Sequence, residues 1–172
     1  MLRLRRDVVR AVRGGHPWIY AEALVPPPDL LPPGAVVEVA DFVGRFLARG
    51  LWNPDSPIAV RVFTLDKSEL VDDALVRRRF LAAAERRAPI LSPGVTDCCR
   101  LVHGEADGLP GIVCDRYADV AVLRFDDEAA ASLRPAAAEA AASLPGIGNV
   151  VERPFERKGR AGPSGGLAAS AD

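Results

Sequence analysis

Short runs of alternating hydrophobic and polar residues dominate the first 66 residues of the chain. Such alternation is typical of strands that bury one face. We expect these strands at residues 2–6, 35–40, 45–50 and 58–63. Turn residues lie at 41–44 and 53–57, and residues 7–13 predict a short helical turn that ends at Gly14 and Gly15. Several short strands at this spacing predict a small β-barrel.

Hydrophobic residues take up helical spacing further along the chain. Asp72 or Asp73 is the expected N-cap of a helix over residues 73–88, since a short acidic side chain can accept the first free amides. The predicted buried side carries Leu75, Phe80, Leu81 and Ala84, and an arginine-rich face carries Arg77, Arg78, Arg79, Arg86 and Arg87. Strands are then expected at residues 99–103, 111–116 and 119–125, an alanine-rich helix at 127–143 and a last strand at 149–153.

These patterns predict an α+β chain in three parts. Residues 1–66 form the small barrel, and residues 67–155 form a strand-strand-helix-strand α+β domain. Residues 156–172 are expected to be a disordered tail, because they are rich in Gly, Ala, Ser, Pro and charge and have no hydrophobic period. Proline clusters place residues 25–33 in a surface loop of the barrel.

The composition changes the picture in one respect, which is the charge. The formal net charge is −1 and the pI is about 6.1. A globally basic nucleic-acid binder is therefore excluded, although a local basic patch is not. Only two of the 22 basic residues are lysines, Lys67 and Lys158. The arginine excess is typical of a GC-rich genome, so one exposed arginine is not by itself evidence of an RNA contact.

The basic N-terminus lacks the apolar stretch of a signal peptide, and no run approaches the roughly 18 apolar residues of a membrane span. Cys98, Cys99 and Cys114 cannot all pair within one chain. In a protein without a leader they are expected to be reduced thiols. These features predict a cytoplasmic protein with no membrane partner.

Candidate nucleic-acid contacts lie in the predicted barrel. His16 and Trp18 flank Pro17 at the mouth of a strand, where both rings could stack on an unpaired base. Alternatively, Trp18 fills the barrel core and His16 makes a local hydrogen bond. Arg45, Arg49 and Arg61 are candidate phosphate or base contacts.

Two longer motifs make the pattern specific. The first joins His16-Pro17-Trp18 to Gly44-x-Phe46-Leu47-Ala48-x-Gly50, Asn53-Pro54-x-Ser56 and Ile58-Ala59-x-Arg61-Val62. It resembles the PUA domain that opens the class I S-adenosylmethionine-dependent methyltransferases of large-subunit (23S) rRNA, which act on cytosine C5. The resemblance implies an RNA-binding pseudo-barrel. The RNA-binding candidates are then His16, Trp18, Arg45, Arg49, Asn53 and Arg61.

The second motif, residues 100–117, resembles the signature of the middle α+β domain of that family, so the resemblance covers about residues 1–155. It implies interface or RNA roles for Arg100, His103, Glu105, Asp107, Asp115 and Arg116. His103, Glu105 and Asp107 alternate, which on a strand would gather them for acid–base or metal chemistry. The glycines and Pro110 nearby favour a turn instead.

The cysteines invite a catalytic interpretation, because cytosine-C5 methylation uses a cysteine thiolate as nucleophile. In the family that cysteine belongs to the catalytic domain, and the residues around Cys98 and Cys99 do not match its motif. Adjacent cysteines plus Cys114 also lack the spacing of a zinc site. We expect no catalytic and no metal-binding residue here.

A methyltransferase domain needs a Rossmann-like sheet with a glycine-rich turn after its first strand. Residues 159–166 are glycine-rich but follow no adequate strand. We therefore expect a truncated chain without the domain that would bind S-adenosylmethionine, inactive alone, with rRNA and a missing or separate methyltransferase domain as partners. The alternatives are an interaction module that docks a catalytic domain or a second copy through the arginine-rich helix, and a truncated gene product without function.

Overall fold

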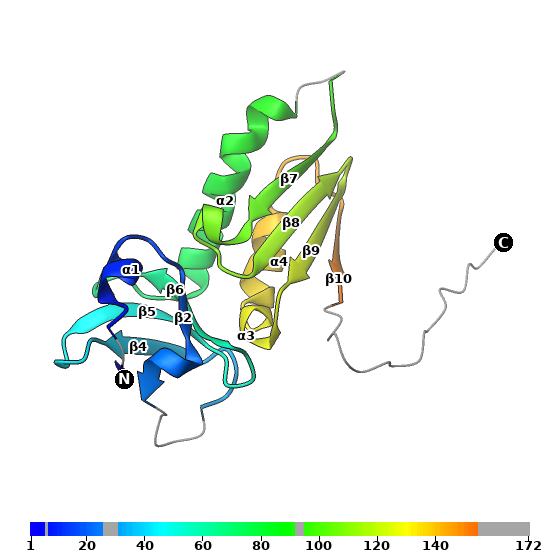
Figure 1. Ribbon diagram of the computed structural model, residues 1–172. Coiled ribbons are helices and arrows are strands. Elements are labelled where there is room, and N and C mark those ends of the chain that lie inside the picture. The colour runs from blue at the N-terminus through cyan, green and yellow to red at the C-terminus, as the bar shows by residue number, and fades with distance from the viewer. Residues whose placement is uncertain (6, 26–30, 92–94, 155–172) are drawn as a thin grey trace, which may run out of the picture.

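The computed structural model describes residues 1–5, 7–25, 31–91 and 95–154. The chain forms two β units that lie side by side, with a long helix, α2, leading into the second (Figure 1). The expected loop at 25–33 falls mainly outside the described residues, and the expected tail at 156–172 falls entirely outside them.

The first unit is a curved sheet of six short strands with the order β2-β6-β5-β4-β1-β3. The strands are β1 (Leu2–Leu4), β2 (Trp18–Tyr20), β3 (Leu24–Val25), β4 (Val36–Ala40), β5 (Phe46–Trp52) and β6 (Ile58–Thr64). The short helix α1 (Val9–Arg13) follows β1, and a 3-10 turn (Ala21–Ala23) precedes β3. Leu4, Ile19, Val39 and Val60 fill its core. The four strands expected from alternation are present, and β2 lies where a strand was expected to begin at Trp18. Strand β3 was not expected, because two residues are too few to show a period.

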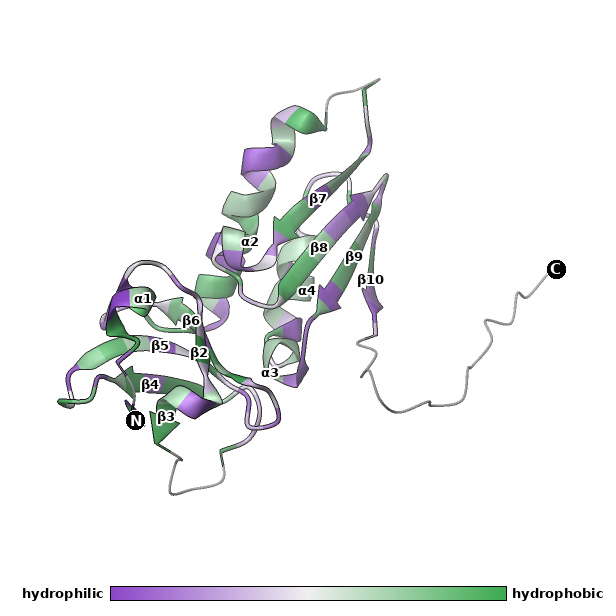
Figure 2. Cartoon of the chain, in the orientation of Figure 1, coloured by the Kyte–Doolittle hydropathy of each residue, from purple (hydrophilic) through white to green (hydrophobic). Residues whose placement is uncertain are grey.

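The second unit is a four-stranded sheet with the order β10-β9-β8-β7, covered on one face by α2 and α4 (Figure 1). Its elements are α2 (Asp73–Arg87), a 3-10 turn (Ala88–Ile90), β7 (Cys98–His103), a 3-10 turn (Gly104–Asp107), β8 (Ile112–Tyr117), β9 (Val120–Phe125), α3 (Glu128–Ala131), α4 (Arg134–Ala142) and β10 (Asn149–Arg153). Asp72 caps α2 through the amide of Leu75, at 2.9 Å. Hydrophobic and hydrophilic residues alternate around α2 (Figure 2), which buries Leu75, Val76 and Phe80 but leaves Leu81 36% exposed.

The single helix expected over residues 127–143 is divided in two. Asp127 caps α3 by accepting from the amide of Ala130 at 2.8 Å, and α4 starts afresh with Pro135 in its first turn. Proline lacks the amide that would continue the hydrogen-bond ladder, so it is accepted only at the start of a helix. The break follows from Pro135.

The two units share buried contacts. Leu51 and Phe63 of the barrel belong to the same hydrophobic cluster as Leu75 and Phe80 of the second unit. Gly34 of the barrel lies so close to α3 that a Cβ there would come within 2.5 Å of Ser132. The backbone of the barrel at Gly34 therefore packs directly against the end of α3, where a larger residue would push the two units apart.

Candidate nucleic-acid interface

A groove of about 510 Å³ lies between α1 and the β4–β5 hairpin of the barrel. Its walls carry three arginines, Arg10 and Arg13 of α1 and Arg45 of the hairpin, beside the Phe42 ring. Phe42 is 51% exposed. Guanidinium groups next to an exposed ring suit RNA, because the cations bind phosphates and the ring can stack on a base. We call this the α1 groove.

The local sequence explains why the arginines of α1 face outward. Val12 is the buried residue of α1, so Arg10 and Arg13 are left on its exposed side. Neither arginine has a hydrogen-bond or ion-pair partner among the described residues. Asp7 also lines the groove, but its carboxylate accepts from the amide of Val9 at 3.2 Å. Three arginines and two aspartates, Asp7 and Asp41, line the α1 groove, so its formal charge is positive by one, and Arg10 and Arg13 are the arginines in it without an acidic partner in the described part of the chain.

The hairpin that carries Arg45 is held by the buried Asp41. One carboxylate oxygen of Asp41 accepts from the amides of Val43, at 3.0 Å, and Arg45, at 2.9 Å. The other accepts from Nε of Arg45 at 2.9 Å, while the Arg45 side chain stays 70% exposed. Burial on its own would raise the pKa of Asp41, but these hydrogen bonds hold that pKa below its ordinary value. Asp41 thus orients Arg45 at the rim of the groove.

The His16–Tyr20 segment is an aromatic cluster on the barrel edge. His16 is exposed, its Nδ1 lies 3.3 Å from the amide of Trp18, and its ring lies 6.4 Å from that of Tyr20, which is 41% exposed. Trp18 is half-buried and donates its indole N–H to Glu105 of the second unit at 2.8 Å. His16 and Tyr20 remain open to solvent, whereas Trp18 contacts the other unit.

Arg61 lies at the junction of the two units rather than on an open surface. Its guanidinium lies 2.9 Å from Glu105 and 3.0 Å from Asp127, and the side chain is only 8% exposed. Gly111, in the left-handed region at φ +77°, passes directly over it, and a Cβ there would lie 3.4 Å from Nε of Arg61. Arg61 therefore ties the barrel to the second unit, with Glu105 shared between Trp18 and Arg61.

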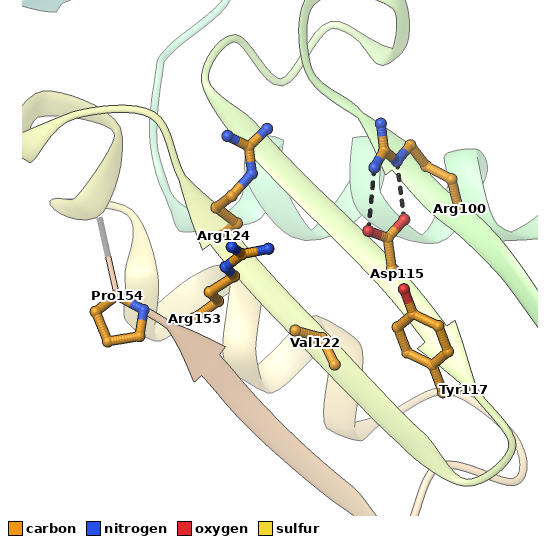
Figure 3. Close-up of a pocket in the computed structure, with 7 residues that line it drawn as sticks. All are labelled: Arg100, Asp115, Tyr117, Val122, Arg124, Arg153 and Pro154. Carbon is orange, nitrogen blue, oxygen red and sulfur yellow. Dashed lines mark hydrogen bonds and ion pairs between the residues drawn. The ribbon is translucent and has the colours of Figure 1, made fainter. Parts of the chain in front are cut away.

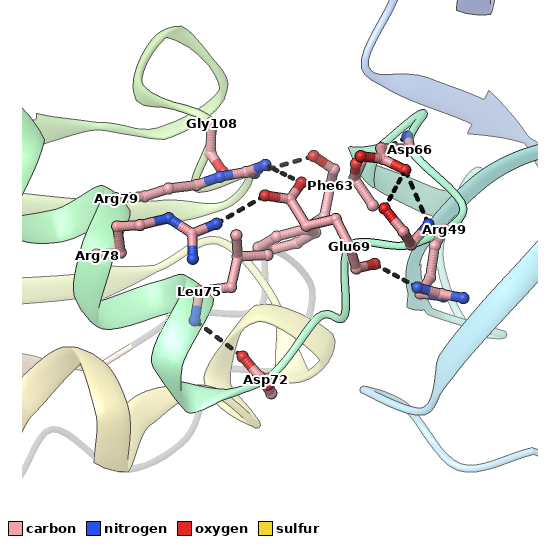
Figure 4. Close-up of polar contacts among 11 residues, drawn as sticks. Arg49, Phe63, Asp66, Glu69, Asp72, Leu75, Arg78, Arg79 and Gly108 are labelled. Atoms are coloured by element: carbon pink, nitrogen blue, oxygen red, sulfur yellow. Dashed lines mark hydrogen bonds and ion pairs between the residues drawn. The ribbon is translucent and has the colours of Figure 1, made fainter.

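Arg49 and Asn53 are also buried. Arg49 binds the segment that leads from the barrel to α2, because it donates to the carbonyl of Glu69 (Figure 4) and to that of Lys67. Its Nη2 also lies 2.6 Å from Glu38. This contact holds the pKa of Glu38 below its ordinary value. Asn53 accepts from the amide of Asp55 at 3.2 Å and so closes the β5–β6 turn.

The candidates of residues 100–117 fall into separate groups. Arg100 and Asp115 form a two-pronged ion pair across β7 and β8, at 2.8 and 3.1 Å, with His103 3.3 Å from Arg100. Arg116 instead donates to backbone carbonyls of Ala118, Pro145 and Gly146. The structure thus brings Arg100, His103 and Asp115 together and places Arg116 elsewhere.

Glu105 and Asp107 lie on a 3-10 turn and point to different neighbours. Glu105 faces the barrel, whereas Asp107, 3% exposed in its side chain, binds Arg86 at 2.6 Å and Arg87 at 2.9 Å near the end of α2. Burial raises the pKa of Asp107, but the two arginines and the amide of His103 hold it below its ordinary value. The described residues hold no cluster of three or more metal-ligating side chains.

The arginine-rich face of α2 is paired within the chain. Arg77 binds Glu139, Arg78 and Arg79 bind Glu69 (Figure 4), and Arg86 and Arg87 bind Asp107. Arg79 also donates to the carbonyls of Phe63 and Gly108, at 2.9 and 2.7 Å. These arginines hold the helix to its surroundings, and their charge is largely compensated.

The three cysteines are free thiols, with Cys98 exposed, Cys99 half-buried and Cys114 buried. Burial raises the pKa of Cys114 to about 12, and burial also raises that of Cys99. A hydrogen bond to Asp97 raises the pKa of Cys98. Since the thiolate is the reactive form, all three environments disfavour nucleophilic chemistry.

Comparisons with known proteins agree with this architecture. Residues 2–65 match the model of a PUA-like domain. The chain is 41% identical over 131 residues to a ribosomal RNA large subunit methyltransferase of Deinococcus radiodurans, covering 72% of this chain and 32% of that protein. It is 39% identical over 110 residues to ribosomal RNA large subunit methyltransferase I of Salmonella arizonae, covering 64% of this chain and 27% of that protein. The chain is therefore similar in sequence to about a third of these methyltransferases.

Solved structures share the fold of this chain. A Streptococcus mutans protein described as a SAM-dependent methyltransferase superposes with a TM-score of 0.74 at 15% identity, covering 88% of this chain and 39% of that one. At this identity the likeness shows the fold alone, and its extent shows that both units recur together. The chain spans about a third of the length of the curated rRNA methyltransferases it matches.

The sequence pattern had indicated Arg45 but neither Arg10, Arg13 nor Phe42, which complete the α1 groove. The basic N-terminal run was the available signal.

Along the part of the chain that the structure describes, no helix is long and apolar enough to span a bilayer.

Proposed function

We propose that this chain is the RNA-recognition part of a methyltransferase that modifies a cytosine of large-subunit rRNA at C5 with S-adenosylmethionine. The observation that carries the proposal is the α1 groove, in which Arg10 and Arg13 have no partner among the described residues and Arg45 and Phe42 lie opposite them. Phosphates would bind the three arginines, and an unpaired base would stack on Phe42.

The remaining barrel candidates divide by exposure. His16 is exposed beside Tyr20 and is proposed to contact RNA directly. Arg49, Asn53 and Arg61 are buried, and the two arginines are bound to acidic side chains and carbonyls of the chain. We assign these three to holding the RNA-binding surface in shape, because a buried, paired arginine would have to break its ion pair to reach a phosphate.

We do not assign methyl transfer to the described residues, because neither of their two sheets has the strand arrangement that binds S-adenosylmethionine. That cofactor needs a parallel sheet with a glycine-rich turn at its carboxyl edge. Among the described strands the parallel pairs are β1–β4 and β9–β10, and the other pairings are antiparallel. We propose that the chemistry belongs to the two thirds of the related methyltransferases that this chain does not match.

The alternative of a protein-interaction module that acts through the arginine-rich face of α2 has less support. Each of those arginines already binds a carboxylate of the chain. We place the protein in the cytoplasm, where rRNA is modified, with rRNA and a methyltransferase domain as its partners.

A salt titration of RNA binding tests the proposal. The full chain is titrated into labelled fragments of large-subunit rRNA at several salt concentrations, and we expect the logarithm of the association constant to fall linearly with the logarithm of salt. Absence of binding, or binding that salt does not weaken, would contradict the proposal. Isothermal calorimetry with S-adenosylmethionine is the companion measurement, with no binding expected at micromolar concentrations.

A further inference from the structure

The four-stranded sheet has one face without a helix. Helices α2 and α4 cover one side, and the other side carries a groove of about 460 Å³ (Figures 1 and 3). The residues that line it come from all four strands and from the position after β10: Arg100, Asp115, Tyr117, Val122, Arg124, Arg153 and Pro154. We call this the open sheet face.

The register of the sheet places two arginines side by side. Arg153 of β10 is paired directly with Arg124 of β9 in a parallel ladder. Neighbouring strands of a sheet lie about 4.8 Å apart, so the two arginine side chains project from adjacent positions. Figure 3 shows both side chains on the same face. Like charges opposite each other destabilise a sheet. An anion held between them would remove that cost.

Acidic partners offset only part of this charge. Arg124 lies 3.2 Å from Asp126, and Asp115 forms its ion pair with Arg100. Arg153 has no partner among the described residues, and its neighbour Glu152 points to the other face, where it binds Arg134. One end of the groove is therefore positively charged.

The other end offers a flat ring and an apolar floor. Tyr117 is 54% exposed, and the Arg100–Asp115 pair lies next to it (Figure 3). Between Tyr117 and the arginine pair lies Val122, with Val151 beside it on β10 and 47% exposed. A common class of RNA-binding domain uses a four-stranded sheet in this way and stacks unpaired bases on its exposed aromatic rings.

We propose that the open sheet face binds a single-stranded segment of RNA, with a phosphate between Arg124 and Arg153 and an unpaired base on Tyr117. The inference rests on the proposed RNA-binding function but adds a second contact surface, on the other unit from the α1 groove. Single-stranded RNA is the occupant that uses both ends of the groove, because it carries phosphates and flat bases in one chain.

Fluorescence anisotropy with a labelled single-stranded rRNA oligonucleotide tests the inference. The double variant R124A/R153A is expected to bind about tenfold more weakly and to show a salt slope smaller by about 1 to 2. R77A/R134A is the matched control, since it removes two exposed arginines from the helix side of the same unit. Y117L is expected to lose about fivefold or more and Y117F less than twofold, because phenylalanine retains the stacking ring.

The outcomes separate this inference from the proposed function. If the wild-type chain binds no RNA, both fail. If R10A/R13A weakens binding while R124A/R153A and Y117L behave like the control, only the open sheet face is refuted, and a protein partner becomes its occupant. Crosslinking of the wild-type chain to 4-thiouridine RNA needs no variant to fold: adducts on Tyr117 or β8–β10 are expected, and adducts confined to the barrel would contradict the inference.

Discussion

Arg61 of the barrel and Glu105 of the second unit form an ion pair, with Nη1 2.9 Å from Oε1. The same carboxylate oxygen accepts the indole N–H of Trp18 at 2.8 Å, and Nε of Arg61 lies 3.0 Å from Asp127. Two conspicuous residues of the PUA-like motif therefore act at the junction between the units. The orientation of the α1 groove relative to the open sheet face, the two surfaces proposed to bind RNA, depends on this small network.

Loss of Arg61 should destabilise the fold. R61A leaves Glu105 and Asp127 without their cation in a half-buried junction, and we expect the free energy of unfolding to fall by about 3 kcal/mol. Urea denaturation measures it. R77A removes an exposed arginine and its ion pair with Glu139, and should cost less than about 1 kcal/mol. If R61A and R77A lower the free energy of unfolding equally, the ion pairs of Arg61 stabilise the fold no more than an exposed ion pair does.

Asp107 should make stability depend on pH. Its pKa in the folded chain lies below the ordinary 3.8, so its contribution is fully present above that value and is lost as pH falls through the folded pKa. At pH 7, D107N should lower the free energy of unfolding by about 2 kcal/mol, since three hydrogen bonds to a charged acceptor are weakened. The difference from wild type should shrink below about pH 4.

Chemical denaturation at several pH values measures this difference. D73N changes an exposed carboxylate in the first turn of α2 and is the control. A D107N deficit that stays constant down to pH 2 would refute the assignment.

Gly50 is expected to tolerate no side chain. A Cβ at this position of β5 would lie 2.1 Å from the carbonyl oxygen of Arg61 on β6, so G50A must separate the two strands that carry Arg49 and Arg61. We expect a loss of several kcal/mol or failure to fold. G15A is the comparison, because Gly15 has positive φ but open space around it, and it should cost about 1 kcal/mol. Thermal melts of both variants decide the question.

Thiol labelling should distinguish the cysteines. Cys98 is exposed, whereas Cys114 is buried with a pKa of about 12, so Cys114 remains protonated and inaccessible near neutral pH. In the native chain a disulfide reagent should modify the exposed Cys98 first, more slowly than a free thiol because its pKa is raised, and Cys114 only at the rate of unfolding. C98S should abolish the fast phase. Rapid labelling of Cys114, identified by peptide mapping, would contradict the burial of this thiol.

Strands β4, β5 and β6 and helix α2 were predictable because their determinants are local. Alternation marks β4, β5 and β6, and Asp72 with the hydrophobic spacing after it marks α2. The break between α3 and α4 also has a local cause, Pro135, but long runs of alanine concealed it.

The roles of the arginines were not predictable, because they depend on partners far away in the chain. Arg61 pairs with residues 44 and 66 positions later, and Trp18 with one 87 positions later. Nothing near Arg49 or Arg61 in the sequence indicates that each is buried, and nothing near Arg10 indicates that it lines the same groove as Arg45. Spacing identified the arginine-rich segments, and only the fold separated paired arginines from free ones.

The function proposed for this chain depends most on the α1 groove, and the salt dependence of RNA binding tests it most directly. Wild type, R10A/R13A and the control R77A/R134A are titrated against the same rRNA fragment from low to high salt. R10A/R13A should bind at least tenfold more weakly at low salt, and its slope should fall by about 1 for each phosphate that the variant no longer binds, while the control retains the wild-type slope. An unchanged slope and affinity in R10A/R13A would contradict the central claim.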